Sequence, residues 1–390
     1  MEPGAVLVDL FVLFAAAKIL GELFEHVGQP AVVGELLGGV LVGPHLLGWV
    51  GTGSESVLEL LAELGVVILL FTVGLETSIR ELRQVGRSAL LVGSLGVILP
   101  FAFGAGLMAL LGYERGDALF VGAALSATSV GVTARVFRDL GAIRTIAARV
   151  VLGAAVVDDI LALVILAVVT GLAADTFSGL QVASLLGVIV LFLAVVLLAG
   201  PQVVRRIREF AHLPIVPGSP LVFAMLLTLG LAALSETIGL AAIIGAFLAG
   251  LIFEFRKDEV VTQVEPIYEF LVPFFFAVTG SHLDVGVFGN TDILALAAAI
   301  TVIAVVTKLA GGYLGSLGIG RDALLVGVGM VPRGEVGLIV ASIGLNRGII
   351  STELFGVVVI MTVITTVVTP PVLGPMIRRR VPRKKTGGAS

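Results

Sequence analysis

The sequence contains no cysteine and little charge. None of its 390 residues is Cys, and only 13% are Asp, Glu, Lys or Arg. Without cysteine the chain forms no disulfide, holds no thiolate-bound metal and performs no thiol catalysis. In a soluble globular domain about a quarter of the residues are charged. The low charge therefore excludes an ordinary soluble domain.

The remaining composition is apolar. Hydrophobic residues make up 58% of the chain, and 50 residues are glycine. A membrane-spanning helix needs roughly 20 apolar residues, so about thirteen helices fit the length and leave no room for a large extramembrane domain. Small residues let helix backbones approach closely in lipid. We therefore predict an all-α polytopic membrane protein.

Hydropathy, with breaks at glycine, proline and charge clusters, predicts thirteen spans. They cover residues 5–24, 31–48, 57–76, 88–111, 117–138, 147–170, 180–204, 219–235, 239–254, 265–281, 292–316, 322–345 and 354–377. Separation of the eighth span from the ninth rests on the short polar run Ser235 to Thr237. A merger of these two spans would leave twelve.

The basic residues test this count, because cytoplasmic loops hold most Lys and Arg. One set of alternate loops holds only Arg115 and Arg347, and Lys18, Lys308 and Arg333 lie inside spans. The other set holds Arg80, Arg83, Arg87, Arg135, Arg138, Arg144, Arg149, Arg205, Arg206, Arg208, Arg256, Lys257, Arg321, Arg378, Arg379, Arg380, Arg383, Lys384 and Lys385.

This asymmetry predicts an odd number of helices in the cell membrane (the inner or plasma membrane), with the N-terminus outside and the C-terminus in the cytoplasm. Residues 1–380 form a single transmembrane unit, and residues 381–390 form a short basic tail that lies near anionic lipid.

Two of the spans are interrupted by polar residues. The fifth contains Ser126 to Gly131, and the twelfth contains Met330 to Glu335, with a proline, an arginine and a glutamate at mid-span. Such interruptions at corresponding places in two halves indicate discontinuous helices whose unwound backbone lines a cavity, as in inverted-repeat transporters. For the fifth span alone, ordinary helix packing by small polar residues is an equal alternative.

Asp158 and Asp159 form the strongest signal, because they lie well inside an apolar helix. Each carboxylate costs roughly 2.5–3.5 kcal/mol at the centre of a membrane helix. Adjacent helical positions point about 100° apart, so one can face a water-filled cavity while the other reaches a neighbour. That neighbour is Lys308, mid-span in another apolar helix. The second carboxylate, with hydroxyl oxygens of Thr128 and Ser129, can then bind a proton or a hard cation such as Na⁺.

These residues carry a family resemblance. The segments 127–135 (ATSVGVTAR), 152–159 (LGAAVVDD) and 327–339 (GVGMVPRGEVGLI), together with Lys308, resemble bacterial sodium/proton antiporters of the second monovalent cation/proton antiporter family, NapA type. Residues 29–35 (QPAVVGE) and the stretches 63–65 and 74–76 are also similar to that family. The likeness runs from the first helix to about residue 380.

The resemblance implies a homodimer of thirteen-helix protomers, each with a dimerisation domain and an ion-translocating core interleaved in sequence. Helices five and twelve would be discontinuous and cross in an inverted-repeat fold. Asp159 would be the main ion- and proton-binding carboxylate, Asp158 would pair with Lys308, and Thr128 and Ser129 would lie beside the ion.

Further expectations concern charge and mechanism. Glu335 would offset the positive helix ends at the crossing, and Arg333 would line a cytoplasmic funnel or neutralise Glu335. The paired aspartates resemble electrogenic members, which exchange two protons for one Na⁺ while an elevator motion carries the site across the membrane. No cofactor, nucleic acid or nucleotide-binding domain is expected, and the chain stops after its basic tail, unlike potassium-efflux relatives.

Other classes of protein also use two membrane carboxylates. An intramembrane aspartyl protease needs them opposed across a cleft, which neighbours on one helix do not provide, so we predict no enzyme. A potassium/proton antiporter, a sodium-coupled symporter and a cation channel of related fold stay open as alternatives.

Overall fold

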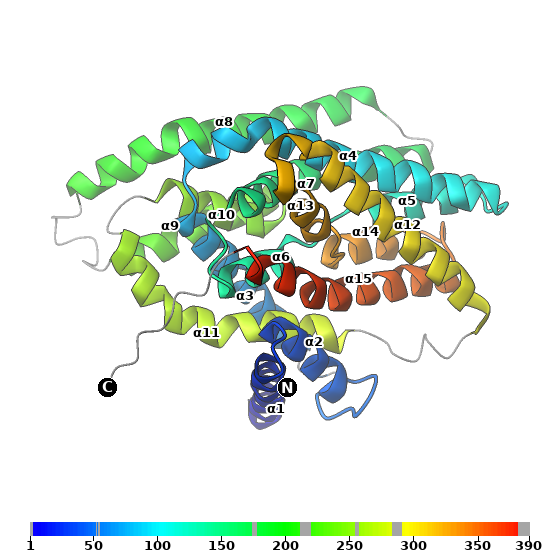
Figure 1. Cartoon of the computed structure of the whole chain (residues 1–390), viewed down its shortest axis with the longest axis horizontal. Coiled ribbons are helices and arrows are strands. Elements are labelled where there is room, and N and C mark those ends of the chain that lie inside the picture. The colour runs from blue at the N-terminus through cyan, green and yellow to red at the C-terminus, as the bar shows by residue number, and fades with distance from the viewer. Residues whose placement is uncertain are drawn as a thin grey trace.

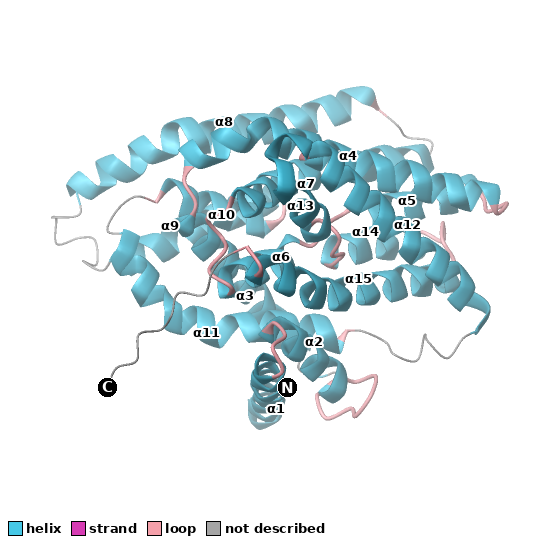
Figure 2. Cartoon of the chain, viewed as in Figure 1, coloured by secondary structure: helices cyan, strands magenta, loops and turns pink. Residues whose placement is uncertain are grey.

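The computed structural model is a bundle of helices (Figures 1 and 2). It describes residues 3–51, 53, 55–173, 178–210, 220–253, 257–282 and 291–380, and every regular element in those ranges is a helix. The predicted basic tail, 381–390, lies outside the described residues.

The first half of the described chain contains α1 (Pro3–His26), α2 (Ala31–Val42), α3 (Glu55–Glu76), α4 (Ile79–Leu110), α5 (Arg115–Ser126), α6 (Val130–Asp139) and α7 (Ile146–Ala173). The second half contains α8 (Gly179–Phe210), α9 (Pro220–Thr237), α10 (Ala242–Ile252), α11 (Lys257–Ser281), α12 (Thr291–Gly315), the 3₁₀-helix η3 (Leu317–Asp322), α13 (Ala323–Gly329), α14 (Glu335–Asn346) and α15 (Thr352–Arg378).

Length and composition make this a multi-pass membrane protein. Within the described ranges, ten helices are long and apolar enough to cross a bilayer. Three shorter apolar helices accompany them: Ala31–Val42, Ala242–Ile252 and Val336–Asn346. The uncertain boundary between the eighth and ninth predicted spans is a true break, because α9 ends at Thr237, α10 begins at Ala242, and Gly239 between them has φ +89°.

The helices pack in two groups. The site group consists of α4, α5, α6, α7, α12, α13, α14 and α15, and the wall group consists of α1, α2, α3, α9, α10 and α11. Helix α8 contacts α7 on one side and α10 on the other, and it lies along the edge of the bundle opposite α1 and α2 (Figure 1). The groups meet where α6 packs on α2 and α3, and where α15 packs on α2.

Glycine brings backbones together inside each group, as the composition predicted. A Cβ on Gly315 of α12 would lie 2.6 Å from the Val92 amide nitrogen of α4, and one on Gly39 of α2 would overlap the backbone of Ala277 on α11. No side chain fits at either position, so these helices pack backbone against backbone.

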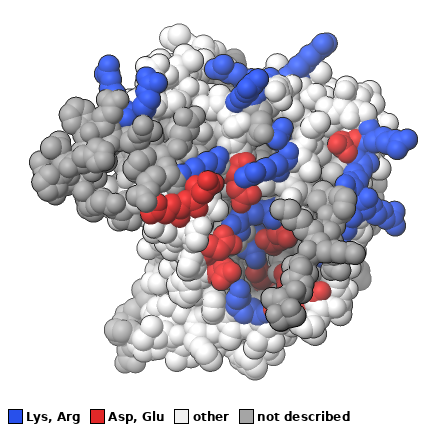
Figure 3. Space-filling view, turned by 60° about the vertical axis from the view of Figure 1, so that its left-hand side comes forward, with Lys and Arg blue, Asp and Glu red and all other residues white. Residues whose placement is uncertain are grey.

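Charged side chains gather at one end of the bundle. Figure 3 shows Lys and Arg spread over this face, around a hollow in which acidic and basic side chains lie together.

Candidate functional site

The two polar interruptions are helix breaks, and the breaks contact each other. Residues 127–129 separate α5 from α6, and residues 330–334 separate α13 from α14. The Ser129 amide donates to the Pro332 carbonyl at 2.9 Å, and the Thr133 hydroxyl donates to the Gly329 carbonyl at 2.7 Å. Proline in a helix removes a backbone donor and clashes with the preceding turn, which explains the end of α13 near Pro332. The freed backbone groups find partners in the other break.

The approach of the breaks requires glycine at one position. A Cβ on Gly334 would lie 2.6 Å from both Cβ and Oγ of Ser129. Any side chain there would push the two breaks apart. Thr128 and Ser129 are both buried, with exposed fractions of 6% and 4%.

Asp158 and Lys308 form a fully buried ion pair. Lys308 Nζ donates to Asp158 Oδ1 at 2.5 Å, and both side chains have no exposed surface. The same ammonium donates to the Ser126 carbonyl at 2.7 Å, where α5 ends. One lysine on α12 therefore joins α7 to the break between α5 and α6.

Two oxygen atoms beside this pair lie close together. Asp158 Oδ2 and Thr128 Oγ1 are both buried, and the Thr128 hydroxyl lies near the Asp158 carboxylate. A carboxylate and a hydroxyl oxygen are suitable ligands for a hard cation.

Asp159 faces a different direction from its neighbour. Its side chain is 8% exposed and lines a small cavity together with Leu70 of α3, Val130 of α6 and Phe247 of α10. The cavity offers about 10 Å³ for the centre of a water molecule, close to the minimum that one water needs. Since α3 and α10 belong to the wall group, Asp159 lies where the two groups meet.

Arg333 is buried rather than exposed to a funnel. Its Nη1 donates to the Val331 carbonyl at 2.9 Å and to the Met330 carbonyl at 3.4 Å, and its Nη2 donates to the Ala304 carbonyl of α12 at 3.1 Å. A cation at the carboxyl end of a helix offsets the partial negative charge of its carbonyls. Arg333 does this for α13. Glu335 begins α14, but its side chain lies outside what the structure describes.

The sequence pattern predicted the two breaks and an ion pair between Lys308 and an aspartate, but it missed other groups. The ion-binding role of Asp159 stays a prediction. Arg135 and Arg138 were read only as topological charges. Their spacing on one face of α6, three residues apart, could have identified them as partners for carboxylates. Within the described ranges, no three His, Asp or Glu side chains are grouped to hold a metal ion.

A membrane bundle that buries a carboxylate–lysine pair where two broken helices meet has the features of a secondary ion transporter. The chain belongs to the sodium/hydrogen exchanger family, because the family described as "Sodium/hydrogen exchanger, transmembrane" matches residues 10–379. The resemblance to sodium/proton antiporters noted in the sequence is thereby confirmed.

Relatives and solved structures agree with this assignment. The chain is 38% identical to the Na⁺/H⁺-K⁺ antiporter GerN of Bacillus cereus, over 91% of this chain and 92% of GerN. It is 32% identical to the high-affinity Na⁺/H⁺ antiporter NhaS3 of Synechocystis, over 93% and 87% of the two chains. The fold is similar to that of the sodium proton antiporter MjNhaP1 from Methanocaldococcus jannaschii, with a TM-score of 0.68 at 18% identity, over 97% and 99% of the chains.

Proposed function

We propose that this protein is a sodium/proton antiporter that binds Na⁺ and protons in turn at Asp159 and Asp158. The observation that carries the proposal is the buried Asp158–Lys308 pair with Asp159 beside it, at the boundary between the two helix groups. Similarity to named Na⁺/H⁺ antiporters supports the same activity.

Competition for the carboxylates couples the two ions. A protonated carboxyl group is a poor ligand for Na⁺, so proton binding releases Na⁺ and Na⁺ binding requires deprotonation. The Thr128 and Ser129 oxygens at the break would complete the Na⁺ site. Lys308 neutralises one aspartate, which leaves the other carboxylate available to a monovalent cation.

Alternating access would come from movement of the site group against the wall group. Asp159 lies on the site group and faces side chains of α3 and α10 on the wall group. In this proposal the site group is the ion-translocating core, the wall group includes the dimerisation domain of a homodimer, and the motion is of the elevator type.

The same proposal includes the finer architecture: thirteen membrane crossings, an inverted repeat, crossed helices at the two breaks, an external N-terminus and location in the cell membrane. Arg333 and Glu335 would compensate the helix ends at the crossing. Exchange of two protons for one Na⁺ would make transport electrogenic.

The test is a proteoliposome assay of Na⁺-driven proton flux. Asp159→Asn should abolish the flux, because an amide neither titrates nor offers a carboxylate to Na⁺. Asp117→Asn, in the half-buried first turn of α5, is the matched control and should transport normally. Retained exchange in Asp159→Asn would refute the proposal. Comparison with the membrane potential clamped and unclamped separates electrogenic from electroneutral exchange.

Potassium is a second candidate substrate, because the relative GerN is a Na⁺/H⁺-K⁺ antiporter by name. The same liposomes, driven by K⁺ or Li⁺ in place of Na⁺, measure the preference. Conductance without proton counter-transport would indicate a channel, and Na⁺ uptake that requires an organic co-substrate would indicate a symporter.

A further inference from the structure

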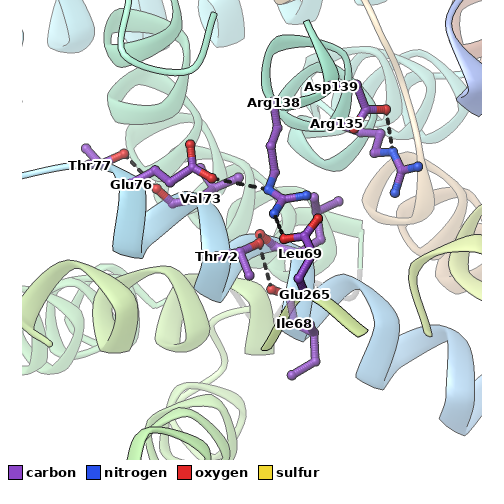
Figure 4. Close-up of polar contacts among 10 residues, drawn as sticks. All are labelled: Ile68, Leu69, Thr72, Val73, Glu76, Thr77, Arg135, Arg138, Asp139 and Glu265. Atoms are coloured by element: carbon purple, nitrogen blue, oxygen red, sulfur yellow. Dashed lines mark hydrogen bonds and ion pairs between the residues drawn. The ribbon is translucent and has the colours of Figure 1, made fainter. Parts of the chain in front are cut away.

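Ion pairs connect the carboxyl-terminal part of α6 to three helices of the wall group, and Figure 4 shows those to α3 and α11. Arg138 Nη2 donates to Glu265 Oε2 of α11 at 2.5 Å, and its Nε lies 3.3 Å from Glu76 Oε1 of α3. One turn earlier, Arg135 Nη2 donates to Glu35 Oε1 of α2 at 3.3 Å. These ion pairs connect the site group to the wall group.

The Arg138 guanidinium makes contacts on the face of its plane as well as through its N–H groups. Its Cζ lies 3.7 Å from the centroid of the Tyr268 ring of α11, a cation–π contact. The Arg138 side chain is only 10% exposed. A guanidinium stays protonated and has donors in a rigid planar fork. One side chain can therefore bridge two carboxylates while it stacks on the ring.

The Arg138 contacts affect the ion site because α6 connects them to the break between α5 and α6. The helix begins at Val130, directly after Ser129 in the break, and ends at Asp139. A helix of 10 residues is stiff and about 15 Å long. A clamp at Arg138 therefore fixes the break relative to the wall group.

Elsewhere α6 meets the wall group through apolar side chains. A Cβ on Gly131 would lie 3.2 Å from the Phe275 ring and 3.5 Å from Val66 Cγ2. Apolar contacts of this kind are non-directional, so they allow one surface to slide over another. The arginine contacts are directional, and each must break before α6 can move.

We infer that Arg138 is a positioning residue that clamps α6 to α3 and α11 and favours the present arrangement of the two groups over one in which the site group has moved. The inference deepens the proposed function, on which it rests, by naming a residue that sets the conformational balance of the antiporter.

The test uses the absence of native cysteine. Val66→Cys together with Gly131→Cys places two thiols across the contact between α3 and α6, because a Cβ on Gly131 would lie 3.5 Å from Val66 Cγ2. A membrane-permeant oxidant such as iodine then oxidises the two thiols to a disulfide, at a rate that reports how often the groups adopt the present arrangement. We expect Arg138→Gln in this background to slow cross-linking roughly fivefold or more.

Arg380→Gln is the matched control. Arg380, just after α15, is bonded to Asp322 and to the Arg321 carbonyl of η3, and η3 itself packs on α7, α12 and α13 of the site group. Its loss should therefore leave the cross-linking rate unchanged. If Arg138→Gln lowers the yield of folded protein, Glu265→Gln replaces it. Glu265 is 41% exposed, and its loss leaves Arg138 paired with Glu76, so a smaller slowing is expected.

An unchanged rate in Arg138→Gln, or equal slowing by Arg380→Gln, would overturn the inference. The cross-linking assay requires no ion gradient and no transport. Failure of the clamp is therefore distinguishable from failure of the antiporter proposal, which Asp159→Asn tests separately.

Discussion

At the scale of single residues, the Lys308 ammonium does two things at once. It neutralises Asp158, and it donates to the Ser126 carbonyl that the end of α5 leaves without a helical partner. Loss of the lysine leaves a buried carboxylate and a buried carbonyl without a donor. Loss of both charges leaves only the carbonyl.

This difference makes a double-mutant cycle informative. We expect Lys308→Gln or Asp158→Asn alone to destabilise the protein by about 3–5 kcal/mol, because each leaves an uncompensated buried charge. The double variant should recover a large part of that loss, since two neutral amide groups replace the pair. Thermal unfolding in detergent micelles measures all four proteins, and additive losses would contradict the coupling.

Sequence reasoning located these residues because a charge in an apolar helix is costly and therefore informative. Charge alone paired Lys308 with one of the two aspartates, and the family resemblance selected Asp158. It did not find the carbonyl partners of Lys308 and Arg333, because carbonyl groups carry no sequence signature. Nor could it find the cluster of carboxylates around Arg135 and Arg138, because three of the four come from other helices, α2, α3 and α11.

At the scale of elements, the two breaks depend on each other. Each exposes backbone groups that the other satisfies, through the Ser129 to Pro332 and Thr133 to Gly329 bonds. Gly334 allows this contact because it has no Cβ.

Gly334→Ala should therefore disturb the contact between the two breaks at the ion site. The added methyl group would lie 2.6 Å from Ser129, and overpacking typically costs about 1–3 kcal/mol. We expect lower thermal stability and a raised KM for Na⁺ in the proteoliposome assay. Gly187→Ala is the control, because a Cβ on that α8 glycine meets nothing within 4 Å. Equal behaviour of the two variants would show that the contact is unimportant.

Element boundaries show what hydropathy does and does not detect. We predicted spans from 88 and 265, whereas α4 begins at Ile79 and α11 at Lys257. The extra turns carry charged residues such as Arg83 and Glu259, which hydropathy counts as loop. The helix continues past the apolar stretch because hydropathy measures transfer into lipid and not helix formation.

At the scale of the whole molecule, the distribution of Lys and Arg among the loops predicts the orientation of the chain in the membrane. The absence of native cysteine allows a direct test with single cysteines and a membrane-impermeant thiol reagent. Asn346→Cys, at the end of α14, should be labelled in intact cells, because this loop is expected outside. Arg144→Cys, between α6 and α7, should be labelled only after permeabilisation. The reverse labelling pattern would show that the orientation in the membrane is opposite to the predicted one.

The glycine contacts have a thermodynamic consequence for the whole bundle. Inside each group, backbones touch at positions such as Gly39 and Gly315, whereas Gly131 between the groups meets only side chains. Helices that separate within a bilayer exchange protein neighbours for lipid chains, so little apolar surface becomes hydrated. Hydration of apolar surface is the main source of the heat capacity of unfolding. Separation of these helices in lipid should therefore have a small heat capacity change, and their stability should depend on lipid packing more than on temperature.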